Sequence, residues 1–318
     1  MKEYLFRRLL SLIPTVFGVT ILVFLMMRLI PGDPVSLLMG ENATKELEAD
    51  LRQQYGLDRP LYIQYTLWLG RLVTGDWGNS IIANRPILSD LARRVPITLE
   101  LIVLAMGFAL LIAIPAGIIA ALRPYSWHDY SAMTTATIGV SVPDFFMGIL
   151  LILCFSLFLG ILPAVGYVPL TDSVWGNFKH MILPAVTLGL ARAALLTRLI
   201  RASMMEVIRL DYVTTARAKG VRERSVVLKH ALKNALIPTV TVLGIQVGFL
   251  IGGAIVVETV FSIPGVGSFG IGAISQRDYP QVQAFVLLFA LGFVLANLVV
   301  DILYAFLDPR IKYDQPAS

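Results

Sequence analysis

Six long apolar runs divide this chain, and polar intervals of very different lengths separate them. A helix needs about 20 apolar residues to cross the hydrocarbon core of a bilayer. The runs that reach this length lie at residues 9–29, 98–122, 131–162, 181–204, 239–261 and 282–307. The pattern therefore predicts an all-α integral membrane protein with six transmembrane helices.

The placement of cations predicts the orientation of these helices. Lys2, Arg7 and Arg8 precede the first run, Arg310 and Lys312 follow the last, and the interval between the fourth and fifth runs is rich in Lys and Arg. Short segments with an excess of Lys and Arg stay in the cytoplasm. We therefore expect the N-terminus, the C-terminus and this interval to be cytoplasmic.

Residues 31–97 are then expected outside, because long loops cross a membrane largely regardless of charge. Residues 43–55 and 61–73 have helical patterns, and Asp58 is placed to cap the second of these helices. Residues 75–80, GDWGNS, are typical of a turn. The interval is predicted to be a large folded outer cap after the first helix.

These expectations divide the chain into three parts. Residues 1–93 would form the first transmembrane helix and the outer cap. Residues 94–307 would form the transmembrane core, with five helices and a cytoplasmic loop at about 205–238. Residues 308–318 would form a cytoplasmic tail.

The cytoplasmic loop contains two short helical patterns, at 212–219 and 226–236, that are broken at Gly220. The first pattern begins at Tyr212 and sets small residues beside two cations; its further members are Thr214, Thr215, Ala216, Arg217, Ala218 and Lys219. Small side chains let the backbone of another protein come close, and the cations suit a polar or acidic partner. The second pattern is expected to end at Pro238, where a new segment can start.

This layout resembles the EAA loop of ABC importer permeases, in which a helix, a Gly, a second helix and an Ile/Leu-Pro pair form the socket for the ATPase subunit. Ala216, Gly220, Ile237 and Pro238 stand at the matching spacing, whereas Thr214 and Thr215 replace the Glu and the first Ala of the motif's name. The form DYVTTARAKG at 211–220 is similar to that of the dipeptide/oligopeptide/nickel branch of these permeases. PGDP at 31–34, ILPA at 182–185 and DPR at 308–310 extend this resemblance over nearly the whole chain.

The resemblance implies a binding-protein-dependent type I importer of a bacterial or archaeal cell (inner) membrane. This chain would form half of the pathway for a small solute, with di- and oligopeptides, glutathione and nickel all open. The implied partners are a second homologous permease, two ATP-binding subunits that use ATP and Mg, and a periplasmic or lipid-anchored solute-binding protein. Residues 212–220 would contact the ATPase.

Composition agrees with a membrane protein and gives no sign of an enzyme. Hydrophobic residues make up 57% of the chain and charged residues 15%, against about 25% charged in a soluble domain. The net charge of +5 is read as inner-face charge and not as a nucleic-acid footprint. The single Cys154 can form no disulfide within the chain, and the three histidines form no metal-ligand cluster. No catalytic constellation was found.

A glycine motif in the chain imitates a nucleotide-binding fingerprint. Gly265, Gly267 and Gly270 have the spacing Gly-x-Gly-x-x-Gly, but an apolar run and Pro264 precede them where a strand would be required. The expectation is a flexible outer loop that dips toward the pore. The sequence has no P-loop either, so ATP hydrolysis would have to be carried out by a partner.

Two groups of residues inside the apolar runs are candidates for the pore or for helix packing. Gly244, Gly248 and Gly252 stand four apart with Gln246 between them, and this spacing lets helix backbones touch. The face could meet a partner permease or pack within this subunit, and the sequence leaves both open.

Asp144 and Arg192 form the second group. Both are expected at a similar depth inside the bilayer, on consecutive helices, where a lone charge costs at least about 2.5–3.5 kcal/mol. We expect them to pair or to share a polar cavity, either to hold the helices together or to line the solute path. Such residues also occur in ion-coupled secondary transporters, the alternative function, but the halves of this chain show no repeat.

Overall fold

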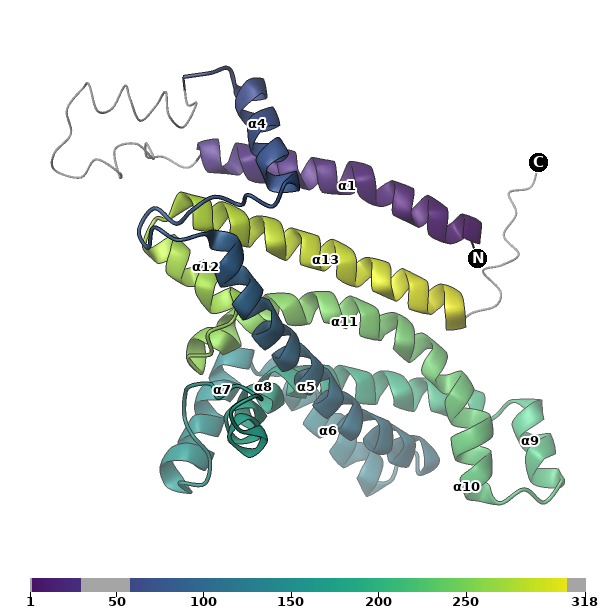
Figure 1. Cartoon of the computed structure of the whole chain (residues 1–318). Helices are drawn as coiled ribbons and strands as arrows, with labels where there is room; N and C mark the ends of the chain where they lie inside the picture. Colours follow the sequence, from purple (N-terminus) through teal and green to yellow (C-terminus); the bar gives the residue numbers. More distant parts are fainter. Residues whose placement is uncertain (1, 30–57, 308–318) are drawn as a thin grey trace. The chain divides into compact units, whose positions relative to one another are not determined.

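The computed structural model describes residues 2–29 and 58–307 of the chain. These residues form helices and connecting loops with no strand among them, apart from one isolated bridge between Asn79 and Pro86. The elements, shown in Figure 1, are α1 (Lys2–Leu29), α4 (Leu61–Val73), α5 (Ile87–Leu122), α6 (Trp127–Ser141), α7 (Asp144–Leu151), η2 (Ile152–Phe158), α8 (Val174–Val207), α9 (Asp211–Ala218), α10 (Glu223–Ser225), η3 (Val226–Ala231), α11 (Leu232–Val260), α12 (Val266–Ser275) and α13 (Tyr279–Leu307).

Five helices are long and apolar enough to cross a membrane, and a sixth crossing is possible where α6 and α7–η2 follow one another. The five are Arg8–Met26, Ile87–Leu122, Val174–Val207, Glu223–Val260 and Tyr279–Val299. A mostly helical membrane protein is confirmed. The orientation of the termini and the number of crossings stay predictions.

The third apolar run is bent by 106° between α6 and α7, so residues 131–162 form two helical segments and not one straight helix. Val142 has β-region dihedral angles (φ −90°, ψ 124°), and Pro143 occupies the N-cap position of α7. The residue before a proline is pushed out of the helical region by the proline ring. Val142 and Pro143 therefore end one helix and start the next.

The chain forms two compact units, which are described separately. One unit comprises residues 97–268 and the end of α13 from Leu295, and the other comprises residues 2–96 and 269–294. The predicted boundary at residue 93 and the role of the tail 308–318, which lies outside the described residues, stay predictions.

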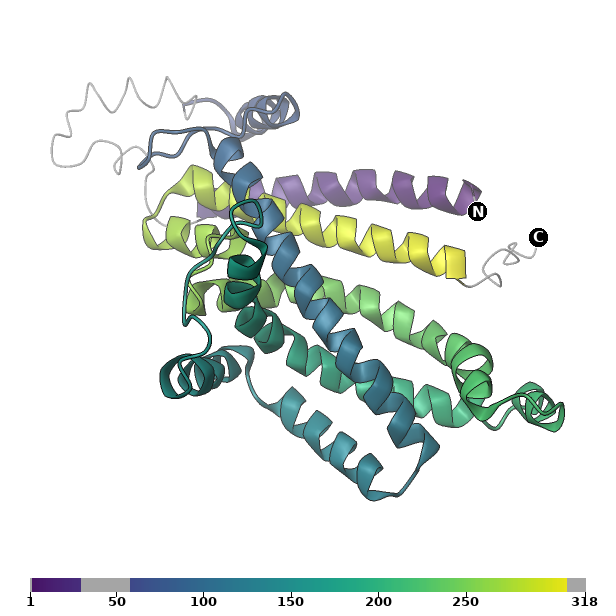
Figure 2. The same ribbon diagram turned by 60° about the horizontal axis from the view of Figure 1, so that its bottom comes forward.

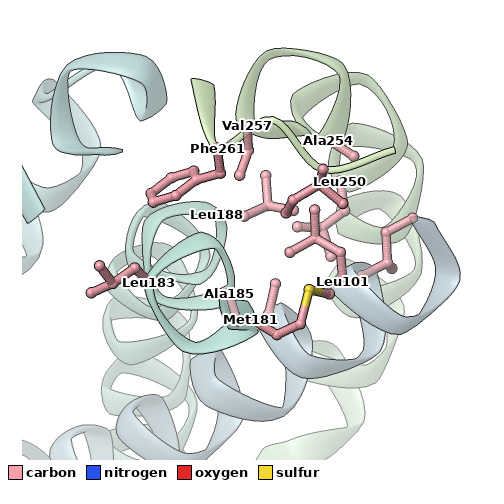
Figure 3. Packing of buried hydrophobic residues seen from close by; sticks show 12 residues of the cluster. Leu101, Met181, Leu183, Ala185, Leu188, Leu250, Ala254, Val257 and Phe261 are labelled. Atoms are coloured by element: carbon pink, nitrogen blue, oxygen red, sulfur yellow. The ribbon is translucent and has the colours of Figure 1, made fainter. Parts of the chain in front are cut away.

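In the first unit, α8 packs against α6, α7 and α11. Figure 3 shows Leu101 of α5, Met181 and Leu188 of α8, and Leu250 and Val257 of α11 meeting in one buried cluster. A second cluster further along the same helices includes many alanines, which let the helices approach closely. Figure 2 shows α8 and α11 running alongside one another and α5 crossing them obliquely.

One glycine makes the contact between α5 and α8 possible. A Cβ atom on Gly189 would lie 2.6 Å from the carbonyl oxygen of Ala105 and 2.9 Å from the ring of Phe108. No side chain fits at this distance from a backbone atom, so the two helices can be this close only because residue 189 is Gly.

In the second unit, α4 packs on α1. The hydroxyls of Thr20 and Tyr65 are 2.8 Å apart, and the rings of Phe24 and Tyr65 meet edge to face. The helix predicted at 61–73 is confirmed. Asp58 as its cap is wrong, because Pro60 occupies the N-cap position and no side chain bonds to the first turn. The helix predicted at 43–55 lies outside the described residues.

The GDWGNS segment is a turn, as predicted. Gly75 and Gly78 have φ angles of 86° and 82°, which favour Gly. The buried Ser80 donates a hydrogen bond of 2.5 Å to the buried carboxylate of Asp278, just before α13. The segment is therefore tied to the start of the last helix.

Two sequence-based boundaries need correction. α11 runs through Pro238 without a break, so the prediction that a new segment starts there is wrong. Transmembrane helices tolerate an internal proline because neighbouring groups satisfy the freed carbonyl, and Figure 1 shows α11 curved in its N-terminal part. The expected flexible loop at 265–270 is also wrong, because Val266 begins the helix α12.

Candidate functional site

The first helix of the loop that is predicted to be cytoplasmic, α9 (Asp211–Ala218), has an inner face that packs on its own chain. Val213 and Val226 are fully buried and Ala216 is 8% exposed, and these three form a small core with Val207 and Val221 against it. Val213 and Ala216 are three residues apart and so lie on the same side of the helix. The loop is therefore a folded unit with its own hydrophobic core.

The other sides of α9 are exposed and carry mainly small or cationic residues. Thr214, Thr215, Ala218 and Lys219 are all exposed. Ala216, which was expected to contact the ATPase with its neighbours, points into the small core instead. A surface available to a partner is thus made by the residues beside Ala216, and a bulky substitution at Ala216 would disrupt the loop itself.

The turn after α9 has the conformation that its glycine allows. Gly220 has φ 74° and open space around its missing Cβ, so only the backbone angle requires Gly there. Arg217 closes the turn by donating two hydrogen bonds to Glu223, from Nη2 at 2.8 Å and from Nε at 3.1 Å. This bonding raises the pKa of Arg217 above its ordinary value.

Tyr212 connects α9 to the helix that follows. Its hydroxyl accepts a hydrogen bond of 2.7 Å from Nδ2 of Asn234, near the start of α11. The same hydroxyl donates one of 3.2 Å to the carbonyl oxygen of His230 in η3. A displacement of α9 would therefore pull on the N-terminal end of α11 through this hydrogen bond.

Asp144 and Arg192 pair, as the sequence led us to expect. Nη1 of Arg192 lies 2.8 Å from Oδ2 and 3.2 Å from Oδ1 of Asp144. Nη2 of the same guanidinium lies 3.5 Å from the carbonyl oxygen of Phe249. The side chain of Arg192 is 12% exposed and that of Asp144 is 21% exposed. The pair joins α7, α8 and α11, and whether it also touches the solute stays a prediction.

The predicted glycine face of α11 is only partly in contact with this chain. Gly244 and Gly248 are buried, Gln246 is half-buried, and Gly252 is exposed with open space where a Cβ would be. The glycine that decides the packing is Gly253. The four-residue spacing of Gly244, Gly248 and Gly252 indicated Gly252 as the packing residue. Gly253 lies directly after Gly252 and does not share that spacing.

Gly253 lets α11 approach the ion pair. A Cβ there would lie 2.8 Å from Leu188, 3.2 Å from Nη2 of Arg192 and 3.3 Å from Oδ2 of Asp144. The glycine thus leaves room for both charged side chains to reach each other.

Sequence reasoning missed a fully buried carboxylate at the end of α11. Glu258 accepts hydrogen bonds from Oγ1 of Thr98, at 2.6 Å, and from the backbone N–H of Ser268, at 3.0 Å. Thr98 in turn accepts one of 2.9 Å from the N–H of Val266. The only signal for this site in the sequence was a Glu near the end of an apolar run.

The same carboxylate explains the glycine motif. A Cβ on Gly265 would overlap the carboxylate of Glu258, one on Gly267 would overlap Cα of Ile255, and one on Gly270 would overlap the ring of Phe285. The spacing that imitates a dinucleotide fingerprint is therefore a packing motif. Its first two glycines leave space for the buried carboxylate and the backbone of α11.

Comparison with known proteins identifies the family. Residues 113–313 match the binding-protein-dependent transport system inner membrane component, and residues 1–102 match the N-terminal part of such membrane components. The chain belongs to this family of ABC importer permeases. It is 48% identical to the glutathione transport system permease protein GsiC of Escherichia coli K12 over 313 residues, which is 98% of this chain and 100% of GsiC. The protein of the same name from Shigella dysenteriae serotype 1 gives the same values.

A solved structure supports the fold of the permease. A chain of the MetNI methionine ABC transporter, in inward-facing conformations, has a TM-score of 0.54 and 21% sequence identity, and the match covers 69% of this chain and 96% of that chain. The permease is thus a membrane-embedded transport subunit of a binding-protein-dependent importer. Among the residues that the structure describes, no group of three or more His, Cys, Asp or Glu side chains could hold a metal ion.

Proposed function

We propose that this permease imports glutathione, or peptides closely related to it, as half of the pathway of an ATP-driven importer. The observation that carries the proposal is the 48% identity to glutathione permeases over their whole length. Identity that extends over the full length includes every helix that could line the pathway. Di- and oligopeptides as a wider class are the alternative substrates of the same mechanism.

In this proposal ATP and Mg are bound by two partner ATPases and not by this chain. A second, homologous permease forms the other half of the pathway, and a solute-binding protein delivers glutathione from the outer side. Both termini and α9 lie in the cytoplasm of a bacterial or archaeal cell, at its inner membrane. The outer cap helps to receive the binding protein.

Docking on the ATPase is assigned to the exposed face of α9. Thr214, Thr215, Ala218 and Lys219 form this face, while Val213 and Ala216 fix the helix from within. The Tyr212 hydroxyl would then carry a displacement of α9 to Asn234 in α11. α11 carries Gly253, which lies against the ion pair between α7 and α8.

Uptake of radiolabelled glutathione tests this function in a strain that lacks its own glutathione importers. The complete importer should restore uptake, and unlabelled glutathione should compete better than an unrelated amino acid. Thr215→Arg, which places bulk on the docking face, should reduce both ATPase co-purification and uptake. Thr171→Arg, the same change at an exposed position in another loop, is the matched control.

Failure of the wild-type importer to take up glutathione, with all subunits assembled, would refute the proposed substrate. Normal ATPase association of Thr215→Arg would refute the assignment of the docking face.

A further inference from the structure

One charged side chain of α8 has no partner although it lies within an apolar helix. Arg198 is exposed, and among the described residues no hydrogen bond or ion pair reaches it. It lies about 9 Å inside the end of the fourth apolar run at residue 204, at 1.5 Å per residue. An arginine at such depth in a membrane helix normally faces the bundle interior or a water-filled cavity, because exposure to lipid is costly.

Arg198 lines a groove over α8, between α6 and α11. The groove has a volume of about 590 Å³ and is lined by Met133, Leu195, Arg198, Leu199, Arg201 and Val242. Its walls are largely apolar, and its size is within the range of about 300–1,000 Å³ of small-molecule sites. A mostly apolar pocket with a few charged groups is the usual form of such a site.

The second arginine of the groove is neutralised. Arg201 donates bonds of 2.5 Å from Nε and 2.6 Å from Nη2 to the two oxygens of Asp129, which is itself buried. This bidentate pair joins α6 to α8 and fixes one wall of the groove. Arg198 is therefore left as the one uncompensated charge among the lining residues.

We infer that this groove is a solute site and that Arg198 binds a carboxylate of the transported peptide. A guanidinium offers two parallel N–H groups to a carboxylate, and such charge-assisted pairs are strong and directional. Glutathione carries two carboxylates and one amine at neutral pH, so its net charge is complementary to that of the groove. The apolar walls would contact the remaining parts of the peptide.

This inference rests on the proposed function and makes it more specific, since the groove would favour anionic over neutral peptides. A carboxylate of the second permease could also meet Arg198, and the experiment below separates that occupant from the solute. The importer with all its subunits is used throughout.

Cysteine protection tests the groove directly, because Cys154 is the only cysteine of the chain. In a Cys154→Ser background, Leu195→Cys places a thiol in the groove, and Val256→Cys places one at another exposed position, on α11. Both are reacted with a membrane-impermeant maleimide in nanodiscs. The ligand probes are S-methylglutathione, which has both carboxylates and no thiol, the acidic dipeptide glutamyl-glutamate and neutral dialanine.

We expect Leu195→Cys to be labelled and S-methylglutathione to slow its labelling, whereas Val256→Cys should be unaffected by the probes. Adding Arg198→Gln should raise the concentration needed for half protection at least about tenfold. Arg198→Lys should retain part of the protection, and Arg209→Gln, at an exposed cation outside the groove, should change nothing.

No labelling of Leu195→Cys would show that the partner permease or lipid covers the groove, and would overturn the inference. Labelling that no anionic peptide slows, or protection that survives Arg198→Gln, would overturn it as well. If glutathione is not imported but glutamyl-glutamate still protects through Arg198, the proposed substrate fails and the groove stands.

Discussion

Gly267 and Gly272 stand on the same short helix, and the structure predicts opposite effects of the same substitution. A Cβ on Gly267 would overlap Cα of Ile255 and lie 3.0 Å from Oε2 of Glu258. A Cβ on Gly272 would meet nothing within 4 Å. Gly267→Ala should therefore destabilise the permease, and Gly272→Ala should not.

The size of the difference follows from two opposing effects. Alanine in place of a glycine within a helix stabilises by about 0.5–1 kcal/mol through the lower entropy of the unfolded chain, and both variants gain this. Overpacking costs about 1–3 kcal/mol, and the upper end applies at Gly267 because the neighbour is a backbone atom of another helix. We expect the two variants to differ by about 3 kcal/mol in stability.

The assay heats the purified importer for a fixed time and measures the monodisperse fraction by size-exclusion chromatography. Gly267→Ala should lose this fraction at a lower temperature than wild type, and Gly272→Ala should match or exceed wild type. Equal curves for the two variants would show that the corner between α11 and α12 is loosely packed. The explanation of the glycine motif by packing would then be wrong.

Three further predictions concern coupling, the ion pair and pH. Gly220→Val should cost about 1–2 kcal/mol at its positive φ and lower the solute imported per ATP hydrolysed; an unchanged ratio would refute a coupling role for this turn. Asp144→Ala and Arg192→Ala should each reduce folded protein, and the double variant should recover much of the loss; additive losses would refute the pairing. Burial, and then its hydrogen bond to Glu100, raise the pKa of Tyr167 to about 12. The stability that the neutral phenol contributes to the folded permease should be complete below pH 10 and be lost as pH rises toward 12. Tyr167→Phe should therefore make the stability of the permease less dependent on pH between 10 and 12, and an unchanged stability profile would contradict this.

The apolar pattern was sufficient to predict most of the fold, because a membrane helix is a local property of about 20 residues. Helix α4 and the break at Gly220 were also predicted, since each depends on a short stretch of sequence. The position of the bend at Val142 and Pro143 could also be predicted, because a proline disfavours the helical conformation of the residue before it. The continuation of α11 through Pro238 could not be predicted from the sequence, because it depends on packing against other helices.

The candidate site was predictable where it depends on local chemistry and not where it depends on contacts between helices. The pairing of Asp144 and Arg192 followed from the cost of a lone charge in the membrane. The burial of Ala216 and the contact of Gly253 with the ion pair depend on which way each helix faces, and the sequence does not fix this. The Glu258 site required three segments to meet, so no single stretch of sequence indicated it.

The central claim is that this permease moves its solute on the ATP hydrolysis of its partners. Its most direct test is glutathione uptake into proteoliposomes that contain the permease pair, the ATPases and the solute-binding protein. We predict uptake that requires ATP on the ATPase side and the binding protein on the other, and that continues when ionophores collapse all ion gradients. Uptake driven by an ion gradient in the absence of ATP would contradict the account.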